Sequence, residues 1–183
     1  MTDKTTLRAK VTAARAARTE QQRARDRAAI REHVLAGCRA GRARPGSTIA
    51  VYEPLRTEPG STELLAALDG AGYHLIVPVT LADRDLDWSP WSAAGRAEAR
   101  LGPDAIASAA LVLVPAFAVD PTGNRLGRGG GSYDRALARL AAGTPVAALL
   151  YRDELLPEVP VETWDQPVGS VVTPDGWRDL TGG

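Results

Sequence analysis

The feature that most constrains the fold is a series of short, uninterrupted apolar runs. They are rich in Val, Ile, Leu and Ala: TIAVY (48–52), HLIVPV (74–79), ALVLV (110–114), VAALLY (146–151) and SVVTP (170–174). A strand with one face in water alternates apolar and polar residues, whereas a strand covered on both faces does not need to. The runs therefore predict strands of a largely parallel sheet with helices on both of its faces.

Helix-forming segments precede the first of these runs. The first 40 residues are rich in Ala, Arg, Glu and Gln and contain no proline. Thr19-Glu20-Gln21-Gln22 fits a capping box, in which side chain and backbone at a helix start bond each other. We therefore expect one helix before Thr19 and a second that continues to about Ala36, with Gly37 as its stop.

Helical patterns also separate the later runs. We expect a helix over 62–72, with Thr62 as its N-cap residue, and another over 135–142. The predicted fold class is α/β: a single domain over 1–183 with a largely parallel central sheet, helices on both faces and two N-terminal helices. In this domain a basic helical segment (1–44) packs on an α/β body (45–183).

The stretch 81–102 shows little periodicity and is expected to be a loop. Its two tryptophans, Trp88 and Trp91, flank Ser89-Pro90. They either anchor the loop in the core or line a ligand site, and the sequence leaves both interpretations open.

Composition narrows the class of protein. No apolar stretch approaches the ~18 residues that a membrane helix needs, and the polar start MTDKTTLRAK lacks the apolar segment of a secretory signal. Cys38 is the single cysteine, which excludes an internal disulfide and fits a reducing cytoplasm. One cysteine with two separated histidines, His33 and His74, argues against a zinc site. We expect a cytoplasmic protein without a membrane partner, and an inert Cys38.

Charge is distributed unevenly along the chain although its net value is zero. Residues 1–44 hold 12 Lys and Arg against 4 Asp and Glu, whereas residues 45–183 hold 10 against 18. Either the N-terminal helices expose solvated basic faces, or they form an arm that binds an anion such as a phosphate ligand or a nucleic acid. Aromatic residues are nearly absent from this segment, which argues against nucleic acid because bases stack on aromatic side chains.

The segment GNRLGRGGGSYDR (123–135) combines five glycines, three arginines and one aspartate. Gly127, Gly129, Gly130 and Gly131 free several backbone N–H groups to point at one anion, and ligands of parallel α/β folds bind beyond the carboxyl ends of strands. Arg125 and Arg128 can donate to phosphate oxygens. The segment matches neither the G-x-x-x-x-G-K-[ST] phosphate loop nor the G-x-G-x-x-G dinucleotide fingerprint.

This segment, with Pro115 and Asp120 before it, resembles the hallmark motif of the 5-formyltetrahydrofolate cyclo-ligase family, roughly P-x-x-x-x-D-x-x-G-x-R-L-G-x-G-x-G-x-Y-D. Three further stretches extend the resemblance over nearly the whole chain: Lys4 to Arg8, Tyr52 to Glu58, and Pro160 to Thr173. The family converts 5-formyltetrahydrofolate and ATP to 5,10-methenyltetrahydrofolate, ADP and phosphate.

The resemblance implies a role for each matched position. Arg125 and Arg128 would act in catalysis by bearing the charge of the transferring phosphoryl group. ATP would be bound by residues of the N-terminal helix and the glycine segment, namely Lys4, Arg8, Arg125, Leu126, Gly127, Arg128, Gly129, Gly130, Gly131, Ser132 and Tyr133. The folate would meet Tyr52, Glu53 and Glu58, and Mg²⁺ would be held by Asp134 and Asp165.

Two positions depart from the family pattern. Trp164 stands where the family often has histidine, and Ser132 where it usually has an aromatic residue. The resemblance implies 5-formyltetrahydrofolate and ATP as ligands, Mg²⁺ as cofactor, no nucleic acid, and a monomer or weak dimer. Two alternatives from other classes stay open, an ATP-dependent phosphotransferase without folate and a non-enzymatic RNA-binding protein.

Overall fold

Ten strands occur in the computed structural model, which describes residues 3–181. They are β1 (Thr48–Ala50), β2 (His74–Thr80), β3 (Leu86–Ser92), β4 (Gly95–Arg96), β5 (Ala109–Pro115), β6 (Ala118–Val119), β7 (Arg125–Leu126), β8 (Val146–Leu149), β9 (Ser170–Thr173) and β10 (Gly176–Asp179). Eight of them form one sheet in the order β10-β9-β8-β5-β1-β2-β3-β4. The middle of this sheet, from β9 to β2, is parallel, and the pairs at both edges are antiparallel. The predicted largely parallel sheet is confirmed, with every predicted strand present.

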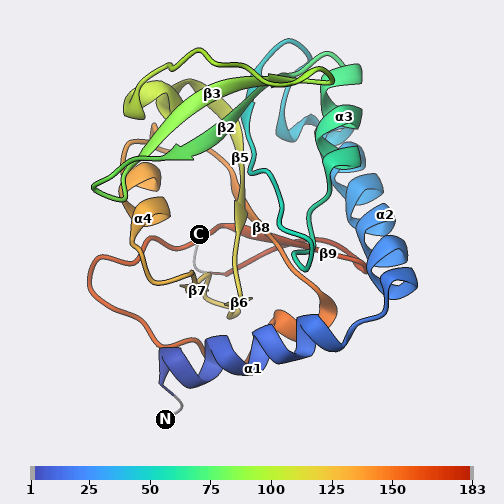
Figure 1. Cartoon of the computed structure of the whole chain (residues 1–183), viewed down its shortest axis with the longest axis vertical. Helices are drawn as coiled ribbons and strands as arrows, with labels where there is room; N and C mark the ends of the chain where they lie inside the picture. The colour runs from blue at the N-terminus through green and yellow to red at the C-terminus, as the bar shows by residue number, and fades with distance from the viewer. Residues whose placement is uncertain (1–2, 182–183) are drawn as a thin grey trace.

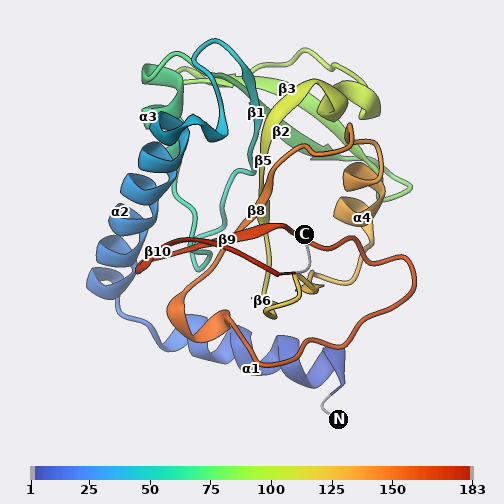
Figure 2. The same ribbon diagram turned by 180° about the vertical axis from the view of Figure 1, so that it is seen from behind.

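Helices cover both faces of the sheet, as predicted (Figures 1 and 2). The α-helices are α1 (Lys4–Ala17), α2 (Glu20–Gly37), α3 (Thr62–Gly70) and α4 (Ser132–Leu137). A π-helical turn (Cys38–Arg42) extends α2, and 3-10 turns span Pro103–Ser108 and Arg152–Glu154. Figure 1 shows α2 and α3 on one side of the sheet and α4 on the other, with α1 lying across one end.

The core explains why the apolar runs do not alternate. On β5, Leu111 and Leu113 belong to the cluster that includes α2 and α3, whereas Val112 and Val114 belong to the cluster that includes α4. All four side chains are completely buried. Successive residues of a strand point to opposite faces, so a strand covered on both faces needs apolar residues at every position.

The helix boundaries follow local capping with two corrections. The capping box at Thr19 and Gln22 is present. The N-cap residue of α3 is Ser61 and not Thr62, because the Ser61 hydroxyl accepts from the Leu64 N–H at 3.2 Å. The helix predicted over 135–142 instead spans Ser132–Leu137, because i→i−3 hydrogen bonds tighten the chain into turns directly after it.

The stretch 81–102 is not a loop throughout, since β3 runs through it antiparallel to β2. Trp88 and Trp91 are buried in the two separate core clusters and act as hydrophobic anchors. The sequence hid this strand because Asp87 interrupts its apolar pattern. That carboxylate is buried, where it accepts from the N–H groups of Trp88 and Gly102.

Two further corrections concern the strands. The apolar run 110–119 breaks at Pro115, after which β6 leaves the main sheet and pairs with β7 in a small hairpin. The glycine segment (123–135) therefore begins in the turn of this hairpin and includes β7, and it does not follow β5 directly. Strand β10 was not predicted, and it extends the sheet beyond β9. No helix within residues 3–181 is long and apolar enough to span a membrane.

Candidate active site

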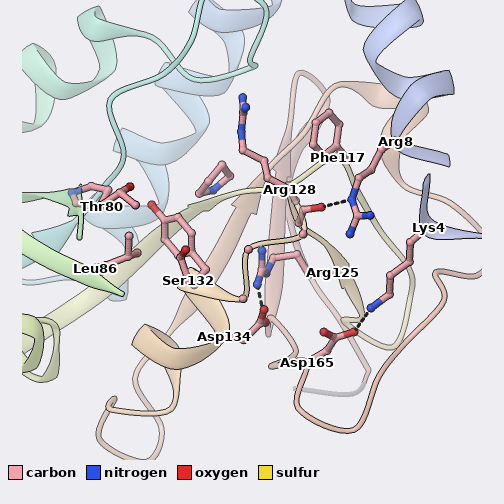
Figure 3. Close-up of a pocket in the computed structure, with 18 of the residues that line it drawn as sticks. Lys4, Arg8, Thr80, Leu86, Phe117, Arg125, Arg128, Ser132, Asp134 and Asp165 are labelled. Atoms are coloured by element: carbon pink, nitrogen blue, oxygen red, sulfur yellow. Dashed lines mark hydrogen bonds and ion pairs between the residues drawn. The ribbon is translucent and has the colours of Figure 1, made fainter. Parts of the chain in front are cut away.

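A pocket of about 240 Å³ opens at the carboxyl edge of the parallel strands. Pro115 ends β5, Thr80 ends β2 and Glu58 follows β1, and all three line it. Here the chain changes direction across the sheet, from β1 and β2 on one side to β5 on the other. Such reversal points are where open α/β sheets place their ligands. Figure 3 shows side chains from α1, the glycine segment and the loop after β8 converging on the pocket.

The glycine segment forms one wall of the pocket, and two of its glycines have clear steric reasons. A Cβ at Gly127 would lie 2.8 Å from Nη1 of Arg125, so glycine lets the Arg125 guanidinium pass beneath the loop. Gly129 has φ of +96°, which favours glycine, and a Cβ at this position would lie 3.4 Å from Cζ of Arg8. The loop thus brings backbone and two guanidinium groups close together at the pocket.

Arg125 is buried beneath this loop and does not reach freely into solvent. Its Nη2 donates to Oδ1 of Asp134 at 2.7 Å, and its side chain is only 4% exposed. The buried Nε of Arg125 and the hydroxyl of Tyr133 have no hydrogen-bond partner within residues 3–181. Burial also raises the pKa of Tyr133, which keeps the hydroxyl protonated. Because buried polar groups are nearly always bonded, these two atoms point to a ligand that the pocket accepts.

Arg128 projects from the same loop toward the other end of the pocket. Its Nη2 donates to Oε1 of Glu58 at 2.9 Å, and its side chain remains 58% exposed. Glu58 is fixed and buried: its Oε2 accepts from the Leu55 N–H at 2.8 Å, and its carbonyl accepts from Arg27. Arg128 is the exposed partner of this pair and is flanked by glycines, whereas Glu58 is buried and held in place.

Helix α1 supplies the cations of the opposite wall. Asp3 caps this helix by accepting from the N–H groups of Thr5 and Thr6. One turn carries Lys4 and the next Arg8, which are four residues apart and lie on one face of the helix. Nζ of Lys4 lies 2.7 Å from Oδ2 of Asp165, and Nε of Arg8 donates to the Gly127 carbonyl at 2.8 Å (Figure 3). The basic N-terminal segment therefore closes the pocket and is not only a solvated face.

The two predicted metal ligands both line the pocket. Oδ1 of Asp134 accepts from Arg125 and from the Gln166 N–H, and Oδ2 of Asp165 accepts from Lys4 and from the Glu162 N–H. The second oxygen of each carboxylate accepts no hydrogen bond from the described residues. The charge of the Asp134 carboxylate is thus balanced by a direct ion pair with Arg125, and no metal is needed between these two side chains.

Magnesium fits this donor set as a partner of a phosphate ligand. Mg²⁺ in nucleotide sites is held by one or two carboxylates, with phosphates and waters completing its shell. No group of three or more His, Cys, Asp or Glu suited to a metal occurs in residues 3–181. The pocket therefore offers carboxylate oxygens to a metal that arrives with phosphate, and it contains no all-protein metal cage.

Most of the predicted site residues meet at the pocket, but three do not line it. Glu53 is exposed on the surface, where it forms a 3.3 Å ion pair with Arg96. Tyr52 is buried in the core cluster against α2 and α3. Leu126 points into a small cluster beneath the β6–β7 hairpin.

Sequence patterns missed several residues that build the site. Arg15 lies under the pocket, where Nε and Nη2 pair with both oxygens of Glu154 at 2.7 and 2.9 Å and Nη2 also donates to the Ala116 carbonyl. Phe117, at the pocket wall, lies 5.1 Å from the Arg15 guanidinium carbon and 5.9 Å from that of Arg128, measured to the ring centroid. Only the arginine-rich pattern of α1 hinted at the contacts of Arg15, because its partners Glu154, Ala116 and Phe117 lie more than 100 residues away in the chain.

Comparisons with known proteins agree with this architecture. The model of the 5-formyltetrahydrofolate cyclo-ligase family matches residues 1–174. A 5-formyltetrahydrofolate cyclo-ligase of Mycolicibacterium smegmatis is 37% identical over 164 residues, which cover 80% of this chain and 84% of that protein.

Solved structures share the fold. A 5,10-methenyltetrahydrofolate synthetase from Mycoplasma pneumoniae has a TM-score of 0.80 at 20% identity, over 94% of this chain and 99% of that chain. The NMR structure of Aquifex aeolicus 5,10-methenyltetrahydrofolate synthetase has a TM-score of 0.73 at 25% identity, over 98% of this chain and 94% of that chain.

Proposed function

The chain belongs to the 5-formyltetrahydrofolate cyclo-ligase family, and from that membership we propose that it uses ATP and Mg²⁺ to convert 5-formyltetrahydrofolate to 5,10-methenyltetrahydrofolate. The products would be the methenyl compound, ADP and phosphate. The observation that carries the proposal is the convergence of Lys4, Asp165 and the glycine segment on one pocket. That convergence joins cations, backbone donors and carboxylates, the groups that phosphoryl transfer requires.

The proposed reaction runs in two steps. The formyl oxygen attacks the γ-phosphorus of ATP, the bond from that phosphorus to the bridging oxygen breaks, and ADP leaves. This forms a phosphorylated, imidate-like formyl group. N10 of the folate then attacks the formyl carbon and loses its proton, and phosphate leaves with the former formyl oxygen. Phosphorylation is needed because an amide-like oxygen is a poor leaving group, whereas phosphate is a good one.

The protein would contribute positioning and charge neutralisation to these steps. Arg128, exposed on its glycine-flanked loop, would neutralise charge on the transferring phosphoryl group. Arg125 would support it from below, with its unpartnered Nε facing the ligand. Lys4 and Arg8 would hold the phosphates of ATP from the side of α1.

The metal and the folate would meet different groups of the pocket. Asp134 and Asp165 would hold Mg²⁺, which when bound neutralises charge on the phosphates. Glu58 would accept from the donor edge of the pterin ring, for which a fixed, buried carboxylate is a suitable acceptor. We propose Glu58 alone for this contact, since Glu53 and Tyr52 do not line the pocket.

The test is the absorbance of the methenyl product after purified protein is mixed with 5-formyltetrahydrofolate, ATP and Mg²⁺. We expect product only when all three are present, with one ADP and one phosphate formed per folate converted. Glu58→Gln should raise KM for the folate, whereas the matched variant Glu53→Gln, outside the pocket, should behave as wild type. If the folate stays unchanged while ATP is consumed with another acceptor, the protein is instead an ATP-dependent phosphotransferase that does not use folate.

A further inference from the structure

Within the described part of the chain, Trp164 is the one large apolar side chain that is both exposed and part of the pocket. Among residues 3–181 the exposed large hydrophobic side chains are Leu55, Leu101, Val161 and Trp164. Only Trp164 lines the pocket, and it is 64% exposed. A single exposed apolar residue needs no explanation on an ordinary surface. At the wall of a ligand pocket, an exposed indole is available to a ligand.

The backbone that carries this indole is held in place on both sides. The N–H of Glu162 donates to Asp165 Oδ2 at 2.8 Å, and the N–H of Asp165 donates back to the Glu162 carbonyl at 3.1 Å. The next residue, Gln166, donates its N–H to Asp134. Trp164 is therefore an anchored platform whose side chain is free, and not part of an unattached loop.

The neighbours of Trp164 indicate which ligand it meets. Lys4 pairs with Glu162, two residues before Trp164, and with Asp165, directly after it. These are the charges proposed to hold phosphate and Mg²⁺. Figure 3 shows Lys4 and Asp165 on the side of the pocket opposite Thr80 and Leu86. If phosphates bind at Lys4 and Asp165, a flat ring system attached to those phosphates would extend from these charges and lie next to Trp164.

We propose that Trp164 stacks on the adenine ring of ATP and so selects a nucleotide over a bare polyphosphate. This inference rests on the proposed function, because it assigns the base of the nucleotide that the reaction uses. An indole suits the task because it presents a large π-surface that can stack on a purine. Stacking contributes to affinity through the base alone, and the phosphate contacts of Lys4 and Arg8 are independent of it.

The experiment compares two probes by calorimetry in the presence of Mg²⁺: a non-hydrolysable ATP analogue, which has the base, and inorganic tripolyphosphate, which lacks it. Trp164→Ala should weaken binding of the analogue by about 10-fold, within the range that removal of a base-stacking side chain produces. Binding of tripolyphosphate should stay within about 2-fold, and Trp164→Phe should keep most of the affinity for the analogue. In wild type, the analogue should change tryptophan fluorescence more than tripolyphosphate does, because the other tryptophans, Trp88, Trp91 and Trp177, do not line the pocket.

Val161→Ala is the matched control, since Val161 is 55% exposed on the same segment but does not line the pocket. It should bind both probes as wild type does. Equal losses for both probes in Trp164→Ala would make Trp164 a support of the phosphate site and overturn the proposal. Unchanged affinity for the analogue, or a loss confined to the folate, would overturn it as well. If the wild type binds neither probe, the proposed function itself fails, which is a distinct result.

Discussion

Asp120 is the residue whose replacement should reveal most clearly how the site is held. It is 3% exposed and lies at the start of the turn between β6 and β7. Its Oδ1 accepts from the N–H and hydroxyl of Thr122 and from the N–H of Asn124, at 2.7–3.1 Å. Its Oδ2 accepts from Asn124 Nδ2 at 2.9 Å and from the Val159 N–H at 3.1 Å. One carboxylate thus joins the hairpin to the segment that leads to Asp165.

Asp120→Asn keeps the size of the side chain but places an NH₂ group where one oxygen now accepts. An NH₂ in place of Oδ1 faces three donor groups, and an NH₂ in place of Oδ2 faces two. If it faces Val159, the buried Val159 N–H is left without a partner, which costs about 1–3 kcal/mol, and Asn124 Nδ2 keeps only its bond to the Thr122 hydroxyl. Together with the lost charge-assisted bonds, we expect a loss of about 2–4 kcal/mol in the free energy of unfolding.

The assay is urea unfolding of wild type, Asp120→Asn and the control Thr122→Val. With an m-value of about 2 kcal/mol per molar urea, the Asp120→Asn midpoint should fall by about 1–2 M. Thr122→Val removes one hydroxyl donor from an exposed residue and should shift the midpoint by less than about 0.5 M. Equal, small shifts for both variants would refute the role of the carboxylate as the hub of this turn.

The pH dependence supplies a second check with a defined sign. Burial raises the pKa of Asp120, but hydrogen bonds from Thr122, Asn124 and Val159 outweigh it and hold the pKa below its usual value. A carboxyl group with a lowered pKa in the fold stabilises the protein above its unfolded pKa of about 3.9. This contribution is lost as pH falls through the folded pKa. The stability difference between wild type and Asp120→Asn should be constant near neutral pH and shrink below about pH 4.

Three other predictions follow from single contacts. Arg15→Met leaves the Glu154 carboxylate buried and unpaired, so the free energy of unfolding should fall by about 3–5 kcal/mol. Because burial already raises the pKa of Glu154, Tm should fall further at pH 8 than at pH 5, and an equal fall at both pH values would contradict this reasoning. Glu58→Gln releases Arg128 from its ion pair, so calorimetry should show about 2- to 5-fold tighter binding of tripolyphosphate, whereas weaker binding would mean that Glu58 positions Arg128 for the phosphates. Arg128→Ala should mainly lower kcat, by about 100-fold, and Arg8→Ala should mainly raise KM for ATP; steady-state rates with ATP varied will show whether the two effects separate.

Much of the fold was predictable because burial on both faces of a sheet leaves a continuous apolar run in the sequence. Strands β5 and β8 gave this signal, and the capping box of α2 gave another that depends on only four residues. Strand β3 gave none. Its Asp87 is buried, and the carboxylate accepts hydrogen bonds from the N–H groups of Trp88 and Gly102. The bond from Gly102 is a tertiary contact that no local pattern reveals.

The site was predictable at the level of motif and less so at the level of contact. The glycine segment identified its own backbone as a wall of the pocket. The sequence could not show that Arg125 pairs with Asp134, or that Arg128 pairs with Glu58, 70 residues away. Which charges meet depends on where the topology places the loops. The same limit explains Glu53, which lies near Glu58 in sequence but on the surface in space.

The way in which the pocket balances its charges bears on how its ligands must enter. Three ion pairs among the residues that line the pocket join a group proposed to bind phosphate with a carboxylate proposed to bind metal or folate: Lys4–Asp165, Arg125–Asp134 and Arg128–Glu58. A phosphate ligand alone would have to draw the cations away from their carboxylates, and a metal alone would have to displace the cations. A phosphate that arrives with Mg²⁺ supplies a new partner to both members of the first two pairs, so neither the cations nor the partly buried carboxylates are left uncompensated. The third pair differs, because Glu58 is proposed to accept from a hydrogen-bond donor such as the pterin edge and not to bind the metal. With these proposed roles, the charges of the pocket are best satisfied when nucleotide, metal and folate are all present, which is the state in which the proposed reaction takes place.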